Sequence, residues 1–263
     1  MSAQHNEHGL PIGAPLTTWT PPHRPSAQRL VGRWCHLRPL EPDLDAPALF
    51  QTLAHPAAAP WWTYLPDAPP ATAAEFHAWA VRRTSEPSTQ AYVIVEPNID
   101  AVRGTLSYLR IDPPNGSIEL GMILFAAGLQ RTTAATESIY LLLRHAFELG
   151  YRRVEWKCDS LNAPSRRAAE RFGFTFEGIF RQAVVTKGRN RDTAWYSMLD
   201  REWPTRRLAF ESWLAPTNFD STGRQRGRLS DLIAVARSER RPAVEKSLER
   251  SEEVGERKAE SVA

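Results

Sequence analysis

Hydrophobic and polar positions change their spacing several times along the chain, and each change marks a predicted element. Residues 30–38, LVGRWCHLR, alternate between the two faces of an extended chain, which is typical of a strand. Three further runs with strand character follow one another at 91–96, 101–111 and 117–126. The connections between them are short and rich in Pro and Asn, so we expect these three strands to be antiparallel neighbours.

Two segments with helical character lie between the first strand and this group. Residues 41–54 predict a helix with Asp43 as a candidate cap. A second helix is expected to begin after Thr72, because Glu75 completes a capping box, and to end near Thr84. The connection between the two helices is long, aromatic and rich in proline, and loops of this kind often carry function.

The rest of the pattern completes an alternation of strands and helices. It predicts a helix at 134–149, a strand at 152–159, a helix that is capped by Asn162 and ends at Gly173, and a hairpin of strands at 174–185 and 192–200. The order β–α–α–β–β–β–α–β–α–β–β predicts an α/β (α+β) fold, with a mixed, mostly antiparallel twisted sheet and helices on both faces.

Composition divides the chain into four parts. Residues 1–28 are rich in Pro, Thr and His without periodicity, so we expect an extended arm ahead of a main domain at 29–203. Residues 204–237 contain two short amphipathic segments and predict a helical extension. Charged residues dominate 238–263, which we expect to be disordered or a lone solvated helix.

Bulk composition narrows the classes of function. The 263 residues are 42% hydrophobic and 24% charged, as in ordinary globular proteins, and a net charge of +3 does not indicate a nucleic-acid partner. Cys35 and Cys158 lie in strand-like runs, which predicts buried thiols rather than a disulfide. The histidines lack the spacing of metal ligands, so no metal is expected. Without a run of 18 apolar residues or a signal peptide, we expect a cytoplasmic protein with no membrane partner.

A strand–loop–helix unit at 124–148 has the layout that proteins use to hold a phosphate. The apolar run stops at Gly128, a polar loop follows, and helical spacing resumes at about Ala134. Backbone N–H groups at a helix N-terminus bind anions with help from the helix dipole. The alternative is a capped helix start that needs no ligand, because Thr and Arg are common there.

Several short motifs between Ile118 and Leu199 occur in an order that resembles a known family. They are E-L-G-M at 119–122, the loop and helix start at 130–138, N-A-P-S at 162–165, G-F at 173–174 and R-D at 191–192. Together they are similar to the GNAT superfamily of acyl-CoA-dependent N-acyltransferases. Within it they most resemble the branch that acetylates the N-termini of ribosomal proteins, the ribosomal-protein-alanine acetyltransferase-like (RimJ/RimL) type.

The resemblance implies acetyl-CoA as the co-substrate and assigns residues that bind it. They would be Met122, Ile123 and Leu124 on the strand, Gln130, Arg131, Thr132, Thr133, Ala134, Ala135 and Thr136 in the loop and helix start, and Asn162. The family has glycines where Arg131 and Thr133 stand here. The ligand groups of such a loop are backbone amides, so if φ stays below zero the amides of residues 133–136 can still aim at an anion.

The resemblance also implies that an amine attacks the thioester directly. A bulge at 122–124 would free backbone N–H groups to polarise the carbonyl. Ser165, or a water, would protonate the leaving thiolate, because Ala169 holds the position of the family's more widespread tyrosine acid. Glu119 would deprotonate the amine, directly or through water; the alternative is a solvated residue on the sheet face.

The expected acceptor is a primary amine, either a small molecule or a protein N-terminus. By the family layout, the cluster at 61–64 (Trp61-Trp62-Thr63-Tyr64) would lie over the acceptor groove, with Trp62 and Tyr64 as the residues that contact the acceptor; a loop tucked onto the core is an equal alternative. Asp192 would contact the acceptor or would close the hairpin by pairing with Arg189 or Arg191.

These observations predict an acetyl-CoA-dependent N-acetyltransferase. Three other readings stay open: a longer acyl donor, a CoA-binding or CoA-sensing module without catalysis, and a C-terminal extension that binds a partner or RNA through Arg224, Arg226 and Arg228. The oligomeric state is open as well, with a homodimer among the alternatives.

Overall fold

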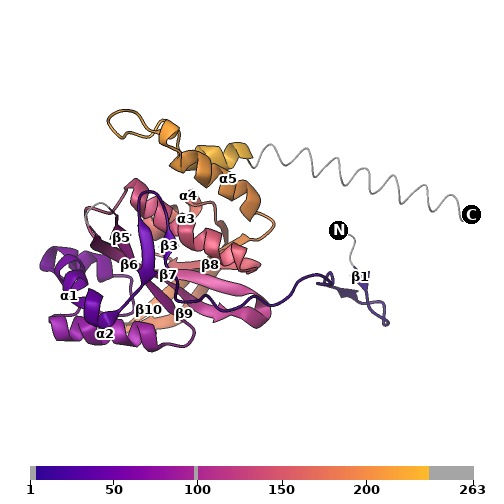
Figure 1. Cartoon of the computed structure of the whole chain (residues 1–263). Helices are drawn as coiled ribbons and strands as arrows, with labels where there is room; N and C mark the ends of the chain where they lie inside the picture. The colour runs from indigo at the N-terminus through magenta and orange to yellow at the C-terminus, as the bar shows by residue number, and fades with distance from the viewer. Residues whose placement is uncertain (1–3, 98–99, 237–263) are drawn as a thin grey trace, which may run out of the picture.

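The computed structural model of the chain describes residues 4–97 and 100–236. Its centre is a twisted sheet of eight strands in the order β3-β4-β5-β6-β7-β8-β10-β9 (Figure 1). These strands are β3 (Leu30–Val31), β4 (His36–Pro39), β5 (Gln90–Glu96), β6 (Ala101–Asp112), β7 (Ser117–Phe125), β8 (Arg153–Asp159), β9 (Thr175–Thr186) and β10 (Arg189–Leu199). All neighbouring pairs are antiparallel except β7 and β8, which are parallel. The predicted mixed, mostly antiparallel sheet is confirmed.

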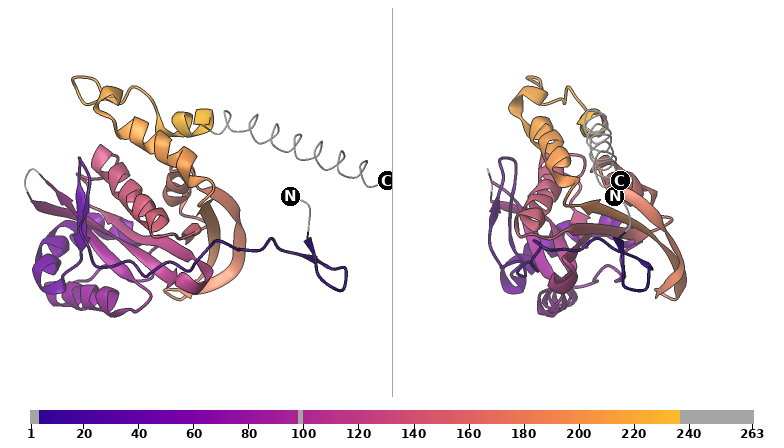
Figure 2. Two further views of the ribbon diagram at one scale, coloured as in Figure 1. Left: turned by 45° about the vertical axis from the view of Figure 1, so that its right-hand side comes forward. Right: turned by 90° about the vertical axis from the view of Figure 1, so that its right-hand side faces the viewer.

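Helices cover both faces of this sheet, as predicted. They are α1 (Pro42–Leu53), α2 (Ala73–Ser85), α3 (Thr133–Glu148), α4 (Ala163–Arg171) and α5 (Trp203–Leu214). α1 and α2 pack on one face together with the 3-10 helix η1 (Pro56–Trp62), and their buried side chains form a cluster of their own. α3, α4 and α5 lie on the other face (Figure 2), where a larger hydrophobic cluster joins them to the sheet.

Local capping chemistry starts α2 and α4 where the sequence predicts. Oγ1 of Thr72 accepts the N–H of Glu75 at 3.2 Å, and the Glu75 carboxylate accepts the N–H of Ala71 at 2.9 Å. At α4, Oδ1 of Asn162 accepts the N–H of Ser165 at 3.1 Å. This bond fixes the first turn of α4, which carries Ser165.

The start of α1 differs from the prediction. Glu41 holds the N-cap position without a side-chain hydrogen bond, so Asp43 is not the cap. Instead, the Asp43 carboxylate contacts Nε2 of His77 on α2 at 2.8 Å. Pro42 occupies the first position of the helix, where it lacks one of the N–H groups that a cap would otherwise satisfy.

Residues 30–38 do not form the single strand that their alternation predicts. The chain turns between β3 and β4, and a carboxylate from α3 holds the turn. Glu137 accepts the N–H groups of Arg33, Trp34 and Cys35 at 2.9, 2.6 and 2.8 Å. This partner lies about a hundred residues further along the chain, so the local pattern could not reveal it.

The segment after the sheet is helical and packs on the domain. Trp203 on α5 stacks on Phe147 of α3 at a centroid distance of 5.1 Å. Residues 229–236 form a further helix, whose Leu229 and Ile233 are buried in the same cluster as α3. The segment 238–263 lies outside the described residues.

The N-terminal segment has little regular structure. Its β1 (Gln4–His5) and β2 (Pro11–Ile12) form a small hairpin that lies away from the central sheet (Figure 1). Residues 13–29 contain no helix or strand. Among residues 4–97 and 100–236, no helix has the length and apolar character needed to cross a bilayer.

Candidate active site

The parallel strands β7 and β8 pair only along their first halves. The last paired residues are Leu120 and Trp156, and beyond them residues 121–125 and 157–159 separate. A cavity of about 770 Å³ opens there, and side chains from both strands line it. Its volume lies within the range of small-molecule sites in proteins. The divergence of the two strands therefore locates the candidate site.

β7 carries a bulge at the edge of this opening, as predicted for 122–124. Met122 and Ile123 lie opposite the single β6 residue Leu106, and Met122 has φ of 50°. A bulge interrupts the ladder and leaves an extra residue unpaired. Met122 and Ile123 line the cavity, whereas Leu124 is buried in the cluster beneath α1 and α2. Any contact of Leu124 with a ligand would therefore be through its backbone, as expected for the bulge, and not through its side chain.

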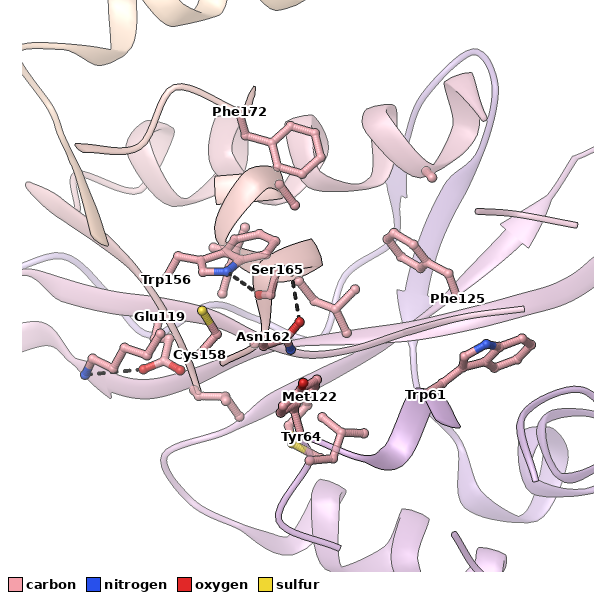
Figure 3. Close-up of a pocket in the computed structure, with 18 of the residues that line it drawn as sticks. Trp61, Tyr64, Glu119, Met122, Phe125, Trp156, Cys158, Asn162, Ser165 and Phe172 are labelled. Carbon is pink, nitrogen blue, oxygen red and sulfur yellow. Dashed lines mark hydrogen bonds and ion pairs between the residues drawn. The ribbon is translucent and has the colours of Figure 1, made fainter. Parts of the chain in front are cut away.

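The middle of the cavity contains Trp156, Cys158, Asn162 and Ser165, which Figure 3 shows gathered between β8 and the start of α4. The indole N–H of Trp156 donates to Oγ of Ser165 at 3.0 Å. Burial raises the pKa of Cys158, and a hydrogen bond with Ser165 acts in the opposite direction. A thiol with a raised pKa stays neutral and is a poor nucleophile.

Thr132 caps α3 and uses two of the amides that were expected to face an anion. Its Oγ1 accepts the N–H of Ala135 at 3.2 Å, and its carbonyl accepts the N–H of Thr136 at 3.4 Å. In the described part of the chain, the loop amides without a protein acceptor are those of Arg131, Thr133 and Ala134. Of these three residues, Arg131 lines the first cavity, whereas Thr133 and Ala134 line a second cavity of about 330 Å³.

Two guanidinium groups flank this helix start. Arg131 has φ of 62°, so the loop enters the left-handed region at a position where the family has glycine, and the condition of negative φ is not met there. Arg171 on α4 donates from both terminal nitrogens to Oγ1 of Thr136 at 3.2 Å. Burial lowers the pKa of Arg171, and no carboxylate among the described residues pairs with it. The start of α3 therefore has backbone amides without a protein acceptor among the described residues and two positively charged side chains close together.

The segment after the sheet contributes to the same end of the cavity. Trp213 on α5 and Gln225 line it, and the Trp213 indole donates to Oε1 of Gln225 at 3.0 Å. The Arg171 guanidinium lies over the Trp213 ring, 5.3 Å from its centroid. The C-terminal extension is therefore part of the cavity wall.

Glu119 lies at the other end of the cavity and is 3% exposed, so the alternative of a solvated surface residue is wrong. Its carboxylate forms ion pairs with Arg110 of β6 and, at 3.3 Å, with Nζ of Lys157 of β8. Lys157 also pairs with Glu155 at 2.6 Å and lies 3.6 Å from the ring centroid of Trp195. Burial lowers the pKa of Lys157.

The aromatic loop is divided between the core and the cavity. Trp62 is fully buried, packs on Trp79 and donates its indole N–H to the carbonyl of Leu53 at 2.7 Å, so it cannot contact an acceptor. Its neighbour Trp61 lines the cavity, together with Tyr64 (Figure 3). This corrects the expectation for Trp62.

Gln130 and Asp192 lie outside the cavity. Gln130 donates from Nε2 to the carbonyl of Phe125 at 3.0 Å. Oδ1 of Asp192 accepts the N–H of Gln182 at 2.7 Å and Nδ2 of Asn190 at 3.0 Å. The hydrogen bond from Gln182 is the main cause that lowers the pKa of Asp192. Asp192 holds the β9–β10 hairpin through these amides rather than through an arginine.

Five cationic residues that line the cavity were not predicted as site residues: Arg83, Arg110, Lys157, Arg171 and Arg191. Lys157 had a signal in the alternation of charged and apolar side chains along 153–159, and Arg191 belongs to the R-D motif at 191–192. The others come from a strand and two helices whose neighbours in space cannot be read from spacing. Among the described residues, no group of three or more His, Cys, Asp or Glu side chains could hold a metal ion.

Comparison with known proteins places this geometry in a family. The model of the acetyltransferase (GNAT) domain matches residues 35–175, more than half of the chain. The chain belongs to the GNAT acetyltransferase family. This is a family of acyl-transferring enzymes, and the predicted fold and family are confirmed.

Individual relatives of this GNAT protein cover different parts of it. A GCN5-related N-acetyltransferase of known structure from Brucella melitensis is 44% identical with a TM-score of 0.81, and the match covers 83% of this chain and 100% of that chain. The uncharacterized N-acetyltransferase p20 of Bacillus licheniformis is 30% identical over 45% of this chain and 66% of that protein, just under two thirds of its length. RimL, a ribosomal L7/L12 alpha-N-protein acetyltransferase, is 25% identical with a TM-score of 0.58, covering 65% of this chain and 94% of RimL.

Proposed function

We propose that this protein transfers an acetyl group from acetyl-CoA to a primary amine by direct attack. The proposal rests on the separation of β7 and β8 beside the bulge at Met122. This separation opens the cavity next to a part of β7 that has no backbone pairing with β8. Acetyl-CoA supplies an activated thioester, from whose carbonyl carbon the amine nitrogen displaces the CoA thiolate. Family membership supports this chemistry.

The residues present fit CoA in charge and polarity. The open amide of Arg131 and the guanidinium groups of Arg131 and Arg171 line the cavity and suit the phosphates, and the open amides of Thr133 and Ala134 lie beside them at the start of α3. The wall between that end and the bulge is apolar and suits the pantetheine arm; it includes Ile123, Phe125, Trp156 and Phe172. Asn162, whose side chain already caps α4, would contact the arm only through its remaining amide group.

Two side chains would take part in the proton transfers to the leaving thiolate and from the attacking amine. Ser165 accepts a hydrogen bond from Trp156 and keeps its own proton, which it can give to the departing thiolate. Glu119 is paired with Arg110 and Lys157, and cations beside a carboxylate weaken it as a base. We therefore assign Glu119 to orienting the amine, or a water that takes its proton.

The acceptor would enter between η1 and the β9–β10 hairpin. Trp61 and Tyr64 line the cavity there, and Nζ of Lys187 at the hairpin tip donates to the carbonyl of Trp62 at 2.6 Å. The likeness to RimL supports a protein N-terminus as the acceptor, and a small-molecule amine is the other candidate.

The proposal is tested by thiol release from acetyl-CoA with a panel of peptides, amino acids, polyamines and aminoglycosides, and by the acetyl mass added to the acceptor. Ala168 lines the cavity, so Ala168→Trp should fill it and stop transfer. Ala163→Trp, at the exposed start of the same helix, is the matched control and should keep it. CoA binding without transfer to any amine would favour a binding module instead.

A further inference from the structure

Arg191 lies over the open end of the cavity. β10 pairs antiparallel with β8, and Thr193 lies opposite Asp159, the last residue of β8. Arg191 stands two residues beyond Thr193 toward the hairpin tip, past the end of β8, and it lines the cavity. Burial lowers the pKa of Arg110 and raises that of Cys158, and the nearby charge of Arg191 lowers both pKa values. Arg191 is thus close to Arg110 at the Glu119 end of the cavity and to Cys158 in its middle.

Arg191 differs from the other cationic residues at this end of the cavity in having no partner for its charge among residues 4–97 and 100–236. Arg110 and Lys157 face the carboxylates of Glu119 and Glu155. Arg83 on α2 has Asp67 as its partner at 3.8 Å. Arg191 has no ion pair or side-chain hydrogen bond within the described residues. Although Asp159 also lines the cavity, the guanidinium group of Arg191 forms no ion pair with it or with any other described carboxylate.

Hydrogen-bond donors without a partner also occur among the arginines that line this cavity. The buried Nε groups of Arg83 and Arg191 have no hydrogen-bond partner in the described part of the chain, and both residues line the cavity. Buried polar groups in proteins nearly always have a partner, so each exception calls for an explanation. Guanidinium groups bind carboxylates through two parallel hydrogen bonds, which gives them both energy and orientation.

We propose that the acceptor amine belongs to a molecule that also carries a carboxylate, which Arg191 binds. This inference rests on the proposed acetyl transfer and names its substrate class. The carboxylate would come either from a free amino acid or a similar small amine, or from an acidic side chain beside a peptide N-terminus. Polyamines and aminoglycosides, which carry only positive charge, fit this end of the cavity poorly.

The same positive charge has a consequence for reactivity. An amine attacks only in its neutral form, and nearby cations favour the neutral form of an ammonium group. A carboxylate on Arg191 would hold the amine in place without relying on the ammonium charge. Recognition and activation of the amine would thus be shared between Arg191 and the groups around Glu119.

Two matched pairs of acceptors test the proposal with the full-length chain and acetyl-CoA. One pair is aminomethylbenzoate and its primary amide, and the other is a peptide that begins Ser-Asp and one that begins Ser-Asn. In the wild type, kcat/KM should favour the carboxylate member by about tenfold or more, through KM. The ratio should fall to about one in Arg191→Gln and to an intermediate value in Arg191→Lys.

Arg189→Gln is the matched control, because Arg189 is exposed on the same strand and does not line the cavity. It should keep the wild-type ratio, and melting curves check that each variant is folded. A preference in only one pair assigns the small molecule or the peptide as the source of the carboxylate. Equal kcat/KM within both pairs in the wild type, or a preference that survives in Arg191→Gln, overturns the inference and leaves acetyl transfer standing. Absence of transfer to every amine removes the proposed function and this inference together.

Discussion

The indole N–H of Trp156 on β8 donates a hydrogen bond to Oγ of Ser165 on α4 across 3.0 Å. Both residues line the cavity at the point where β7 and β8 separate. Because the serine oxygen already accepts this bond, its own proton is left to donate. The pair therefore presents Ser165 as a proton donor beside the opening in the sheet.

Ser165→Ala should lower kcat by about tenfold and leave KM for acetyl-CoA nearly unchanged. The loss is modest because a thiolate is a fair leaving group even without an acid. Trp156→Phe keeps the hydroxyl and removes only its partner, so its effect on kcat should be smaller. Steady-state kinetics of the three proteins decide; an unchanged kcat in Ser165→Ala would remove Ser165 from the proton transfer.

Substitutions at Arg131 can test the effect of its backbone conformation and the effect of its charge separately. Its φ of 62° suits glycine, so Arg131→Gly should raise the stability of the unliganded protein by about 1 kcal/mol. The same change removes a cation from the phosphate end and should raise the Kd of CoA about threefold to tenfold. Arg131→Lys keeps the charge and should bind nearly as the wild type does. Calorimetric titration that shows equal CoA affinity for Arg131→Gly would mean that the side chain does not bind the cofactor.

Replacing Arg171 should weaken CoA binding more than replacing Arg167 on the same helix. It is partly buried, contacts Thr136 and has no carboxylate partner among the described residues, so we expect it to serve an anion. Arg171→Gln should raise the Kd of CoA by about tenfold or more. Arg167→Gln, at an exposed position outside the cavity, is the control and should change Kd little. Equal affinities in the two variants would give Arg171 a purely structural role.

Stability should fall in mild acid because of His145. This residue is 5% exposed, and burial lowers its pKa below the ordinary value of 6.5. The folded protein then takes up a proton less readily than the unfolded chain, so the contribution is complete above about pH 6.5 and is lost as the pH falls toward the folded pKa. Each unit of pKa difference is worth about 1.4 kcal/mol.

Urea unfolding at about pH 7.5 and pH 5.5 measures this loss. His145→Gln should show a smaller loss than the wild type. His23→Gln, at an exposed position, should show the same loss as the wild type. Equal losses in all three proteins would assign the acid sensitivity to other groups.

Much of the fold could be predicted because its signals are local. Alternation found the long strands, and side chains such as Thr72 and Asn162 form the caps that their types and spacing predict. The exceptions depend on distant partners: Glu137 bends the segment that resembled one strand, and Pro42 removes the need for a cap at Asp43. Contacts between residues far apart in the sequence cannot be predicted from local spacing.

The candidate site was predictable where a motif fixes the backbone, and less so where a side chain must face the right way. The bulge and the helix start lie where expected, but the bulge changes the phase of β7, so Ile123 lines the cavity and Leu124 does not. Within η1, likewise, Trp61 lines the cavity and the next residue, Trp62, is buried in the core, the reverse of what was expected for Trp62. Arg191 comes close to Arg110 only because β10 inserts between β8 and β9.

Binding of CoA in the cavity between β7 and β8 is tested most directly by melting the full-length chain with and without the cofactor. A ligand that binds only the folded state stabilises it by RT ln(1 + [L]/Kd), which is about 2.7 kcal/mol at a concentration of about 100 Kd. For a domain of this size, we predict a rise in Tm of roughly 5–10 °C at about 1 mM CoA if Kd is near 10 μM. The rise should disappear in Ala168→Trp and persist in Ala163→Trp. A wild-type Tm that does not change at millimolar CoA would contradict the account.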